Sequence, residues 1–152
     1  MNKSTMAQAT TTNPNEKVPN EYALCTQNDC PKAATCLRHA AVAMMPSDVR
    51  TWRIVSPAYL AQTEGECPYY RSTEKVVYAR GFVRMIRSLP VSISETVAKK
   101  LITRFGRNAY YDMRKGKRAI APAEQEIILT VVAECGAQQE FLFDAYEEMY
   151  SW

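Results

Sequence analysis

The chain has 152 residues, of which 47% are hydrophobic, and a formal net charge of +3 at pH 7. This length suits one domain, or two small ones, and can bury a core without a disulfide or metal. The N-terminal residues are polar, and no run approaches the ~20 apolar residues of a membrane-spanning helix. We therefore expect a cytoplasmic protein without membrane contact.

The charge is distributed unevenly. Residues 119–152 contain seven acids and no Lys or Arg, so all 19 basic residues lie before them. This asymmetry indicates a basic working face and an acidic C-terminal region.

The domain organisation is predicted from composition. Residues 1–19 have few large apolar side chains and are predicted to be a disordered tail. Residues 20–152 are predicted to form one domain, with a cysteine-centred half over 20–90 and a helical half over 91–152.

Several short elements are expected in the N-terminal half. Pro31 suits the first turn of a helix that continues to about Met44. The remaining predictions are a strand over 50–55, a helix over 57–62, a strand over 75–80 for which a helix is the alternative, and a helix over 81–89.

The C-terminal half is predicted to be helical. One helix, capped by Ser92 or Ser94, ends at Gly106, and a second runs from about Asn108 to Lys115. A third helix opens at Pro122 and ends at Gly136. The last segment, residues 141–152, is amphipathic and is assigned to the same bundle. The fold class is therefore α+β and mostly α, with a cysteine-centred half packed on a helical bundle.

Four of the five cysteines fall within residues 25–67, at the spacing C-x4-C-x5-C-x30-C: Cys25, Cys30, Cys36 and Cys67. Cysteine thiolates bind zinc tetrahedrally and also hold iron–sulfur clusters. In the reducing cytoplasm this set favours a metal site over disulfides. Zinc is the expected metal, with a [4Fe–4S] cluster as the alternative. The nearby cations Lys32, Arg38 and Arg71 would offset the thiolate charge.

Other interpretations of these residues remain open. Free cysteine is among the most buried residue types, so the four cysteines could simply be core, or could form redox disulfides. His39 could replace one ligand but is expected on the surface, whereas Cys135 is expected in the core. Tyr69, Tyr70 and Arg71 could line a small pocket beside Cys67.

A basic stretch, RFGRNAYYDMRKGKR, occupies residues 104–118. Its helix, short turn, second helix and glycine-containing basic loop resemble the helix-turn-helix of small repressor-like domains. The nucleic-acid-binding residues predicted from it are Arg104, Arg107, Asn108, Tyr110, Tyr111, Arg114, Lys115, Lys117 and Arg118. The alternative is a solvated helical hairpin whose tyrosines are core and whose cations pair with the acidic C-terminal region.

An enzyme is not expected, because paired catalytic carboxylates, a phosphate-binding glycine loop and a nucleophile elbow are all missing from the sequence. The predicted function is a small nucleic-acid-binding, regulatory protein with a structural four-cysteine metal site and DNA or RNA as partner. One alternative is an adaptor whose basic face meets an acidic protein. Another is an iron–sulfur redox sensor.

Seven stretches resemble a family of small uncharacterised proteins of gut anaerobes, a domain of unknown function: YALC, CPKAATCLR, WRIVSP, CPYYR, ARGF, FGRNAYYDMRKGKR and FDAYEEMYSW. They lie between Tyr22 and Trp152. The resemblance implies one integrated domain behind a variable N-terminal tail, and it brings no assigned activity.

Overall fold

The computed structural model describes residues 17–137 and 139–152, and it is an α+β fold that is mostly helical. The predicted disorder of residues 1–19 falls largely outside these residues. The described residues form two compact units: unit 1 runs from residue 17 to Glu74 and includes Tyr150–Trp152, and unit 2 lies within Lys75–Met149. The boundary between the two compact units lies at Glu74–Lys75. No helix in the described part of the chain is long and apolar enough to cross a membrane.

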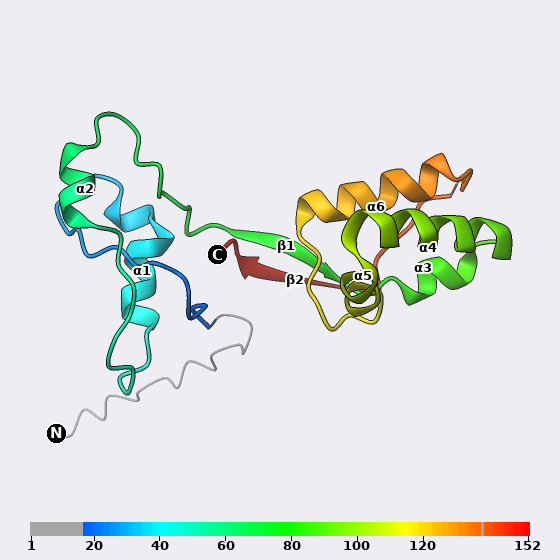
Figure 1. The fold of residues 1–152 in the computed structure, drawn as a ribbon, viewed down its shortest axis with the longest axis horizontal. Coiled ribbons are helices and arrows are strands. Elements are labelled where there is room, and N and C mark those ends of the chain that lie inside the picture. Colours follow the sequence, from blue (N-terminus) through cyan, green and yellow to red (C-terminus); the bar gives the residue numbers. More distant parts are fainter. Residues whose placement is uncertain (1–16, 138) are drawn as a thin grey trace, which may run out of the picture. The chain divides into compact units, whose positions relative to one another are not determined.

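Unit 1 contains little regular structure. A 3-10 helix (η2, Ala33–Thr35) leads into α1 (Leu37–Met44), and α2 (Pro57–Gln62) follows after a long irregular stretch (Figure 1). The helix expected from Pro31 is therefore interrupted. The reason is Cys36, which has extended dihedral angles (φ −92°, ψ 118°) because its backbone pairs with Ser72 in an antiparallel bridge.

The strand expected over residues 50–55 is reduced to one bridge. Leu24 pairs in parallel with Ile54, since the Leu24 N–H donates to the Arg53 carbonyl at 2.9 Å and the Val55 N–H donates to the Leu24 carbonyl at 2.8 Å. Leu24 and Val55 are buried by this pairing, together with Leu37 and Ala41 from α1.

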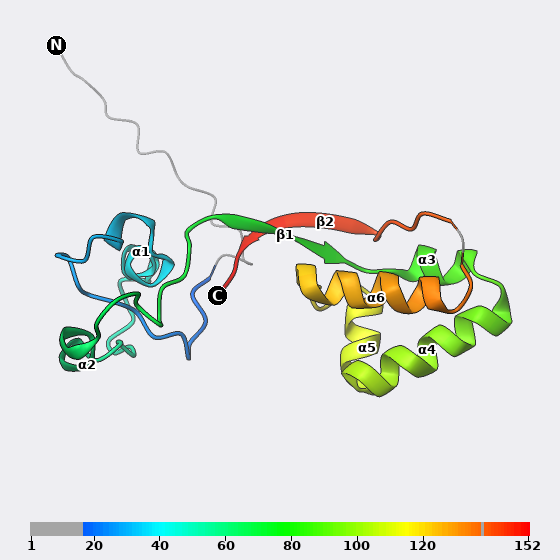
Figure 2. The same ribbon diagram turned by 90° about the horizontal axis from the view of Figure 1, so that it is seen from above.

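Unit 2 combines a two-stranded ribbon with four helices: β1 (Lys75–Arg80), α3 (Val83–Ser88), α4 (Val91–Phe105), α5 (Arg107–Arg114), α6 (Pro122–Glu134) and β2 (Ala145–Tyr150, whose last residue belongs to unit 1). The two strands run in opposite directions, and α4, α5 and α6 lie on one side of them (Figure 2). The core of unit 2 includes the completely buried Phe82, Leu101, Tyr110 and Ile128.

The last strand corrects the expectation of a helical end to the chain. Residues 145–150 pair with β1 instead of packing as an amphipathic helix. Across this pair the Arg80 guanidinium is bonded to the Glu147 carboxylate. On the other side of β1, Ala79 and Ile120 exchange backbone hydrogen bonds of 3.0 and 2.8 Å. The ambiguous segment 75–80 is therefore a strand between two partners.

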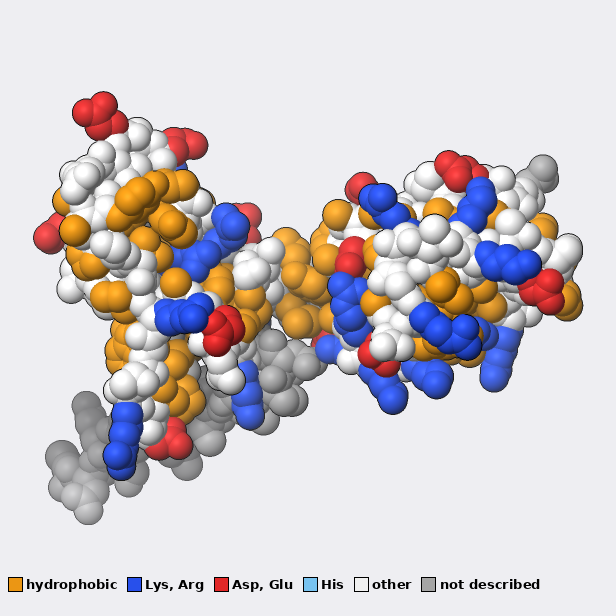
Figure 3. All heavy atoms as spheres, viewed as in Figure 1, with side chains coloured by type: hydrophobic (Ala, Val, Ile, Leu, Met, Phe, Trp, Pro, Cys, Tyr) orange, Lys and Arg blue, Asp and Glu red, His pale blue; other side chains and the backbone are white. Residues whose placement is uncertain are grey.

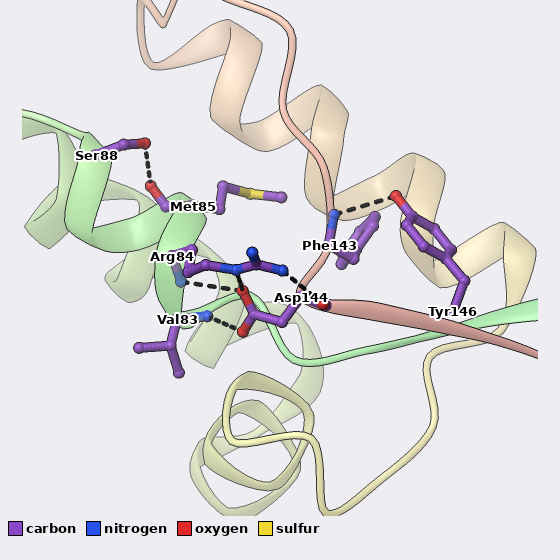
Figure 4. A network of polar contacts seen from close by, with 7 residues as sticks. All are labelled: Val83, Arg84, Met85, Ser88, Phe143, Asp144 and Tyr146. Carbon is purple, nitrogen blue, oxygen red and sulfur yellow. Dashed lines mark hydrogen bonds and ion pairs between the residues drawn. The ribbon is translucent and has the colours of Figure 1, made fainter.

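The entry to β2 also caps α3 (Figure 4). The backbone N–H groups of Val83 and Arg84 donate to the two carboxylate oxygens of Asp144 at 2.8 and 3.2 Å, and the Arg84 guanidinium donates to the same side chain at 3.1 Å. A carboxylate in this position satisfies the free donors of a helix N-terminus. The helix that follows, α4, begins at Val91 after Pro90, so the predicted caps Ser92 and Ser94 lie inside it.

Candidate functional sites: a four-cysteine cavity and a basic helical surface

The four predicted cysteine ligands line a single cavity of about 470 Å³ in unit 1: Cys25, Cys30, Cys36 and Cys67. All are free thiols. Cys36 is buried, with 8% of its surface exposed, and the other three are partly exposed. The predicted pocket residues Tyr69 and Tyr70 line the same cavity. The fold thus gathers cysteines that are up to 42 positions apart in the sequence.

Backbone hydrogen bonds place Cys25, Cys30 and Cys67. The Cys25 N–H donates to the Arg38 carbonyl at 3.0 Å, which fixes the N-terminal segment to α1. Cys30 follows a turn at Asn28 and Asp29, and its carbonyl accepts from the Ala33 N–H at 2.9 Å. The Cys67 carbonyl accepts from the Tyr70 N–H at 3.1 Å, so a tight turn presents the fourth cysteine.

Arg38 joins three of the cysteine-bearing segments. Its guanidinium donates to the Ala23 carbonyl at 2.7 Å, two residues before Cys25, and to the Tyr69 carbonyl at 2.8 Å, two residues after Cys67. The guanidinium also lies 4.3 Å from the centre of the Tyr22 ring. Burial raises the pKa of Tyr22, and the Arg38 charge opposes that rise.

A second cation joins the segments of Cys30 and Cys67. The Lys32 ammonium lies 3.5 Å from the Glu66 carboxylate and 4.9 Å from the centre of the Tyr70 ring. The Tyr70 hydroxyl also hydrogen-bonds the Thr35 hydroxyl at 3.2 Å. These contacts are largely exposed, so they add little stability individually, but they hold positive charge beside the cavity.

The side chains around the cavity surround a space and do not converge on one point. Within residues 17–137 and 139–152, no three His, Cys, Asp or Glu side chains are grouped closely enough to hold a single metal ion. His39 lines the cavity with its Nε2 atom 3.1 Å from the Asn28 amide oxygen. Cys135 lies in unit 2, partly buried against its core.

The second site is the basic surface of α4, α5 and the loop after α5, defined here as Arg104, Arg107, Asn108, Tyr111, Arg114, Lys115, Lys117 and Arg118. Lys and Arg side chains gather around α5 and this loop in Figure 3. Gly106, with φ +85°, ends α4 and lets α5 turn away at once (Figure 2). The predicted helix, turn and helix are therefore present.

One face of α5, continued by the capping residue Lys115, carries two cations and an aromatic ring between them in the sequence. The Arg107 guanidinium and the Lys115 ammonium lie 5.6 and 5.9 Å from the centre of the Tyr111 ring. The three residues are four positions apart, so they share one face of the helix. Tyr111 is partly buried, while both cations are exposed.

Acidic residues pair with only part of the neighbouring positive charge. Arg118 lies 2.6 Å from the Glu124 carboxylate, and Lys100, on α4, lies 3.6 Å from that of Glu134. In the described part of the chain, no ion pair involves the other five cations of the basic surface: Arg104, Arg107, Arg114, Lys115 and Lys117.

The position of Tyr110 corrects one predicted contact. Its side chain is completely buried and packs against Phe82, with ring centres 5.8 Å apart. Because Tyr110 lies one residue before Tyr111, it points into the core and cannot reach a nucleic acid. Sequence reasoning also missed Tyr22, whose ring packs on Arg38 although it is distant from that residue in the sequence.

Comparison with known proteins identifies a family but no described relative. No curated protein and no solved structure matches the chain. The model of a family of unknown function, DUF6078, matches residues 2–152. The match covers nearly the whole chain, including the cysteine cavity and the basic surface, and the chain therefore belongs to the DUF6078 family.

Proposed function

We propose that this protein binds nucleic acid through the basic surface of unit 2, as a small regulatory protein whose unit 1 holds a four-cysteine metal site. The nucleic-acid proposal rests on one surface feature of α5. Arg107, Tyr111 and Lys115 lie four positions apart on one face, with both cations close to the tyrosine ring. Cations that lack acidic partners are free to neutralise phosphates.

The tyrosine adds a second kind of contact. Aromatic rings between cations bind single-stranded nucleic acids, because every base has a face that can stack on a ring while the cations follow the backbone. Tyr111 is partly exposed, and its ring lies close to two such cations. This arrangement favours a backbone-and-stacking mode that tolerates many sequences.

The test is fluorescence anisotropy of the full chain with labelled single-stranded and duplex oligonucleotides over a range of salt concentrations. We expect affinity to fall steeply with salt. Substituting both Arg107→Ala and Lys115→Ala should reduce the salt slope by about 0.7 per lost phosphate contact on single strands and about 0.9 on duplex DNA. Tyr111→Leu should weaken single-strand binding by at least about fivefold with little change in the slope.

Arg50→Ala is the matched control, because Arg50 is an exposed cation of unit 1. It should leave affinity and slope unchanged. The proposal fails if neither oligonucleotide binds at low salt, or if the Arg50 variant weakens binding as much as the α5 variants do.

The metal proposal rests on a separate observation, the cavity lined by Cys25, Cys30, Cys36 and Cys67. Thiolates bind zinc and iron–sulfur clusters, and the free thiols fit the reducing cytoplasm that the sequence favours. Elemental analysis of protein purified without oxygen tests the site. Bound metal should be lost from Cys30→Ala and retained by Cys135→Ala, since Cys135 lies in unit 2.

An adaptor that binds an acidic protein is the second candidate, favoured by the same unpaired cations. The two functions differ in their response to nuclease. A protein partner recovered with the chain would persist after nuclease treatment and disappear with the Arg107→Ala and Lys115→Ala variant, whereas material bound through nucleic acid would be released.

A further inference from the structure

The volume of the cysteine cavity helps to decide whether it holds a single metal ion or a metal cluster. A zinc ion with four thiolates at ~2.3 Å draws the sulfurs to about 3.8 Å from one another, so the site encloses only the ion. The four cysteines of unit 1 instead border about 470 Å³ of space that is partly open to solvent. Such a space suits a polynuclear group in which each thiolate binds a different metal atom.

The wall of the cavity has the chemistry that such a group requires. Val55 and Leu60 provide apolar surface, and Tyr69 and Tyr70 add aromatic surface. A cluster bound by four thiolates is an anion, and its burial is favoured by nearby positive charge and by apolar walls that limit solvent.

Two cations, Arg38 and Lys32, lie at this wall. The Arg38 guanidinium is held by the Ala23 and Tyr69 carbonyls, at 2.7 and 2.8 Å, and both of these partners are neutral. Lys32, held near the Tyr70 ring, also lines the cavity. The hydrogen bonds that hold Arg38 are also the ones that join the segments of Cys25 and Cys67.

We propose that Cys25, Cys30, Cys36 and Cys67 ligate a [4Fe–4S] cluster, with Arg38 as the principal positioning residue and counter-charge. This inference rests on the proposed metal site and specifies its occupant. Each thiol releases its proton to solvent, and each Sγ forms a bond to one iron of the cluster. Ferrous and ferric iron supplied in equal amounts with sulfide form the core without a further oxidant or reductant.

The experiment uses the full chain, purified without oxygen and reconstituted with that mixture of iron and sulfide. We expect about four irons and four sulfides per chain, a broad visible absorption band that air bleaches, and a paramagnetic signal after reduction by dithionite. Cys30→Ala and Cys67→Ala should each lose most of the iron and the band, with folding checked by circular dichroism. Cys135→Ala should retain both.

The alternative results separate the two proposals. About one zinc per chain, dependent on Cys30 and Cys67, would overturn the cluster and leave the four-cysteine metal site in place. Neither zinc nor iron bound by the wild-type chain would overturn both. Equal iron in the wild-type, Cys30→Ala and Cys135→Ala proteins would mean adventitious iron sulfide only, and would also overturn the cluster.

Discussion

Asp144 lies directly against the bare α-carbon of Gly81. The Asp144 N–H donates to the Gly81 carbonyl at 2.8 Å, and a Cβ atom built on Gly81 would lie 2.7 Å from Asp144 Oδ2. Gly81 also has φ +73°, a conformation that side chains rarely adopt. This contact brings the end of β1 next to the start of β2 and places the Asp144 carboxylate at the first turn of α3.

Gly81→Ala should therefore destabilise unit 2 strongly. The positive φ costs ~1–2 kcal/mol for an L-residue, and the overlap with Asp144 adds ~1–3 kcal/mol. The measurement is urea unfolding followed by the circular dichroism of the helices. Gly136→Ala is the matched control, because Gly136 has φ +94° with open space around it and should show only the first cost. Equal losses in the two variants would show that the Asp144 contact is unimportant.

Asp144→Ala should destabilise α3 and the β1–β2 ribbon together. Removing a helix cap costs ~1–2 kcal/mol, and here the Val83 and Arg84 N–H groups would both lose their acceptor. Asp144→Asn keeps an acceptor but loses the charge that faces Arg84, so its loss should be smaller. The same urea titration compares them, with the exposed Glu148→Ala on β2 as control. A Glu148 variant as unstable as Asp144→Ala would contradict this explanation.

The sequence predicted elements whose signals are local. Pro122 at the start of α6 and Gly106 at the end of α4 mark their boundaries chemically, and both predictions agree with the structure. The strand β2 was missed because its partner, β1, lies some seventy residues earlier. Phe141, Tyr146 and Tyr150 fit a helical spacing as well as a strand, and only pairing across the fold decides between the two.

Residue type and spacing likewise predicted part of each candidate site. The spacing of the cysteines identified four residues that the fold places around one cavity. Several cysteines close together in an intracellular chain are typical of a metal site. The basic stretch also predicted the exposed cations Arg107 and Lys115 at the two ends of α5. Sequence reasoning could not separate Tyr110 from Tyr111, since adjacent aromatic residues differ only in which face of the helix meets the core.

Tyr110 should make stability fall at high pH. Burial raises the pKa of its hydroxyl above the usual 10.0, although the nearby Arg114 charge opposes the shift. The unfolded chain releases this proton near pH 10, whereas the folded chain retains it to higher pH. The contribution of Tyr110 to the free energy of unfolding is therefore fully present below about pH 10 and is lost as pH rises through the folded pKa. Unfolding titrations between about pH 8 and about pH 11 measure the fall.

Tyr110→Phe should reduce that fall and change stability near pH 7 by no more than ~1 kcal/mol, because in the described part of the chain the buried hydroxyl has no hydrogen bond of good geometry and Arg114 is the polar neighbour with the largest effect on its ionisation. Tyr111→Phe, at a half-exposed ring, should keep the wild-type pH dependence. An undiminished fall in the Tyr110 variant would assign the effect to other groups.

Arg38→Lys should destabilise unit 1 although it preserves the charge. An ammonium cannot reach the Ala23 and Tyr69 carbonyls as the guanidinium does, nor lie flat 4.3 Å from the centre of the Tyr22 ring. We expect a loss of ~1–2 kcal/mol. Tryptophan fluorescence during urea unfolding reports on this unit selectively, because Trp52 and Trp152 both belong to it. Arg50→Lys, at an exposed position, should leave the urea unfolding of unit 1 unchanged. If Arg38→Lys also leaves it unchanged, the cysteine segments are held together by contacts other than this guanidinium.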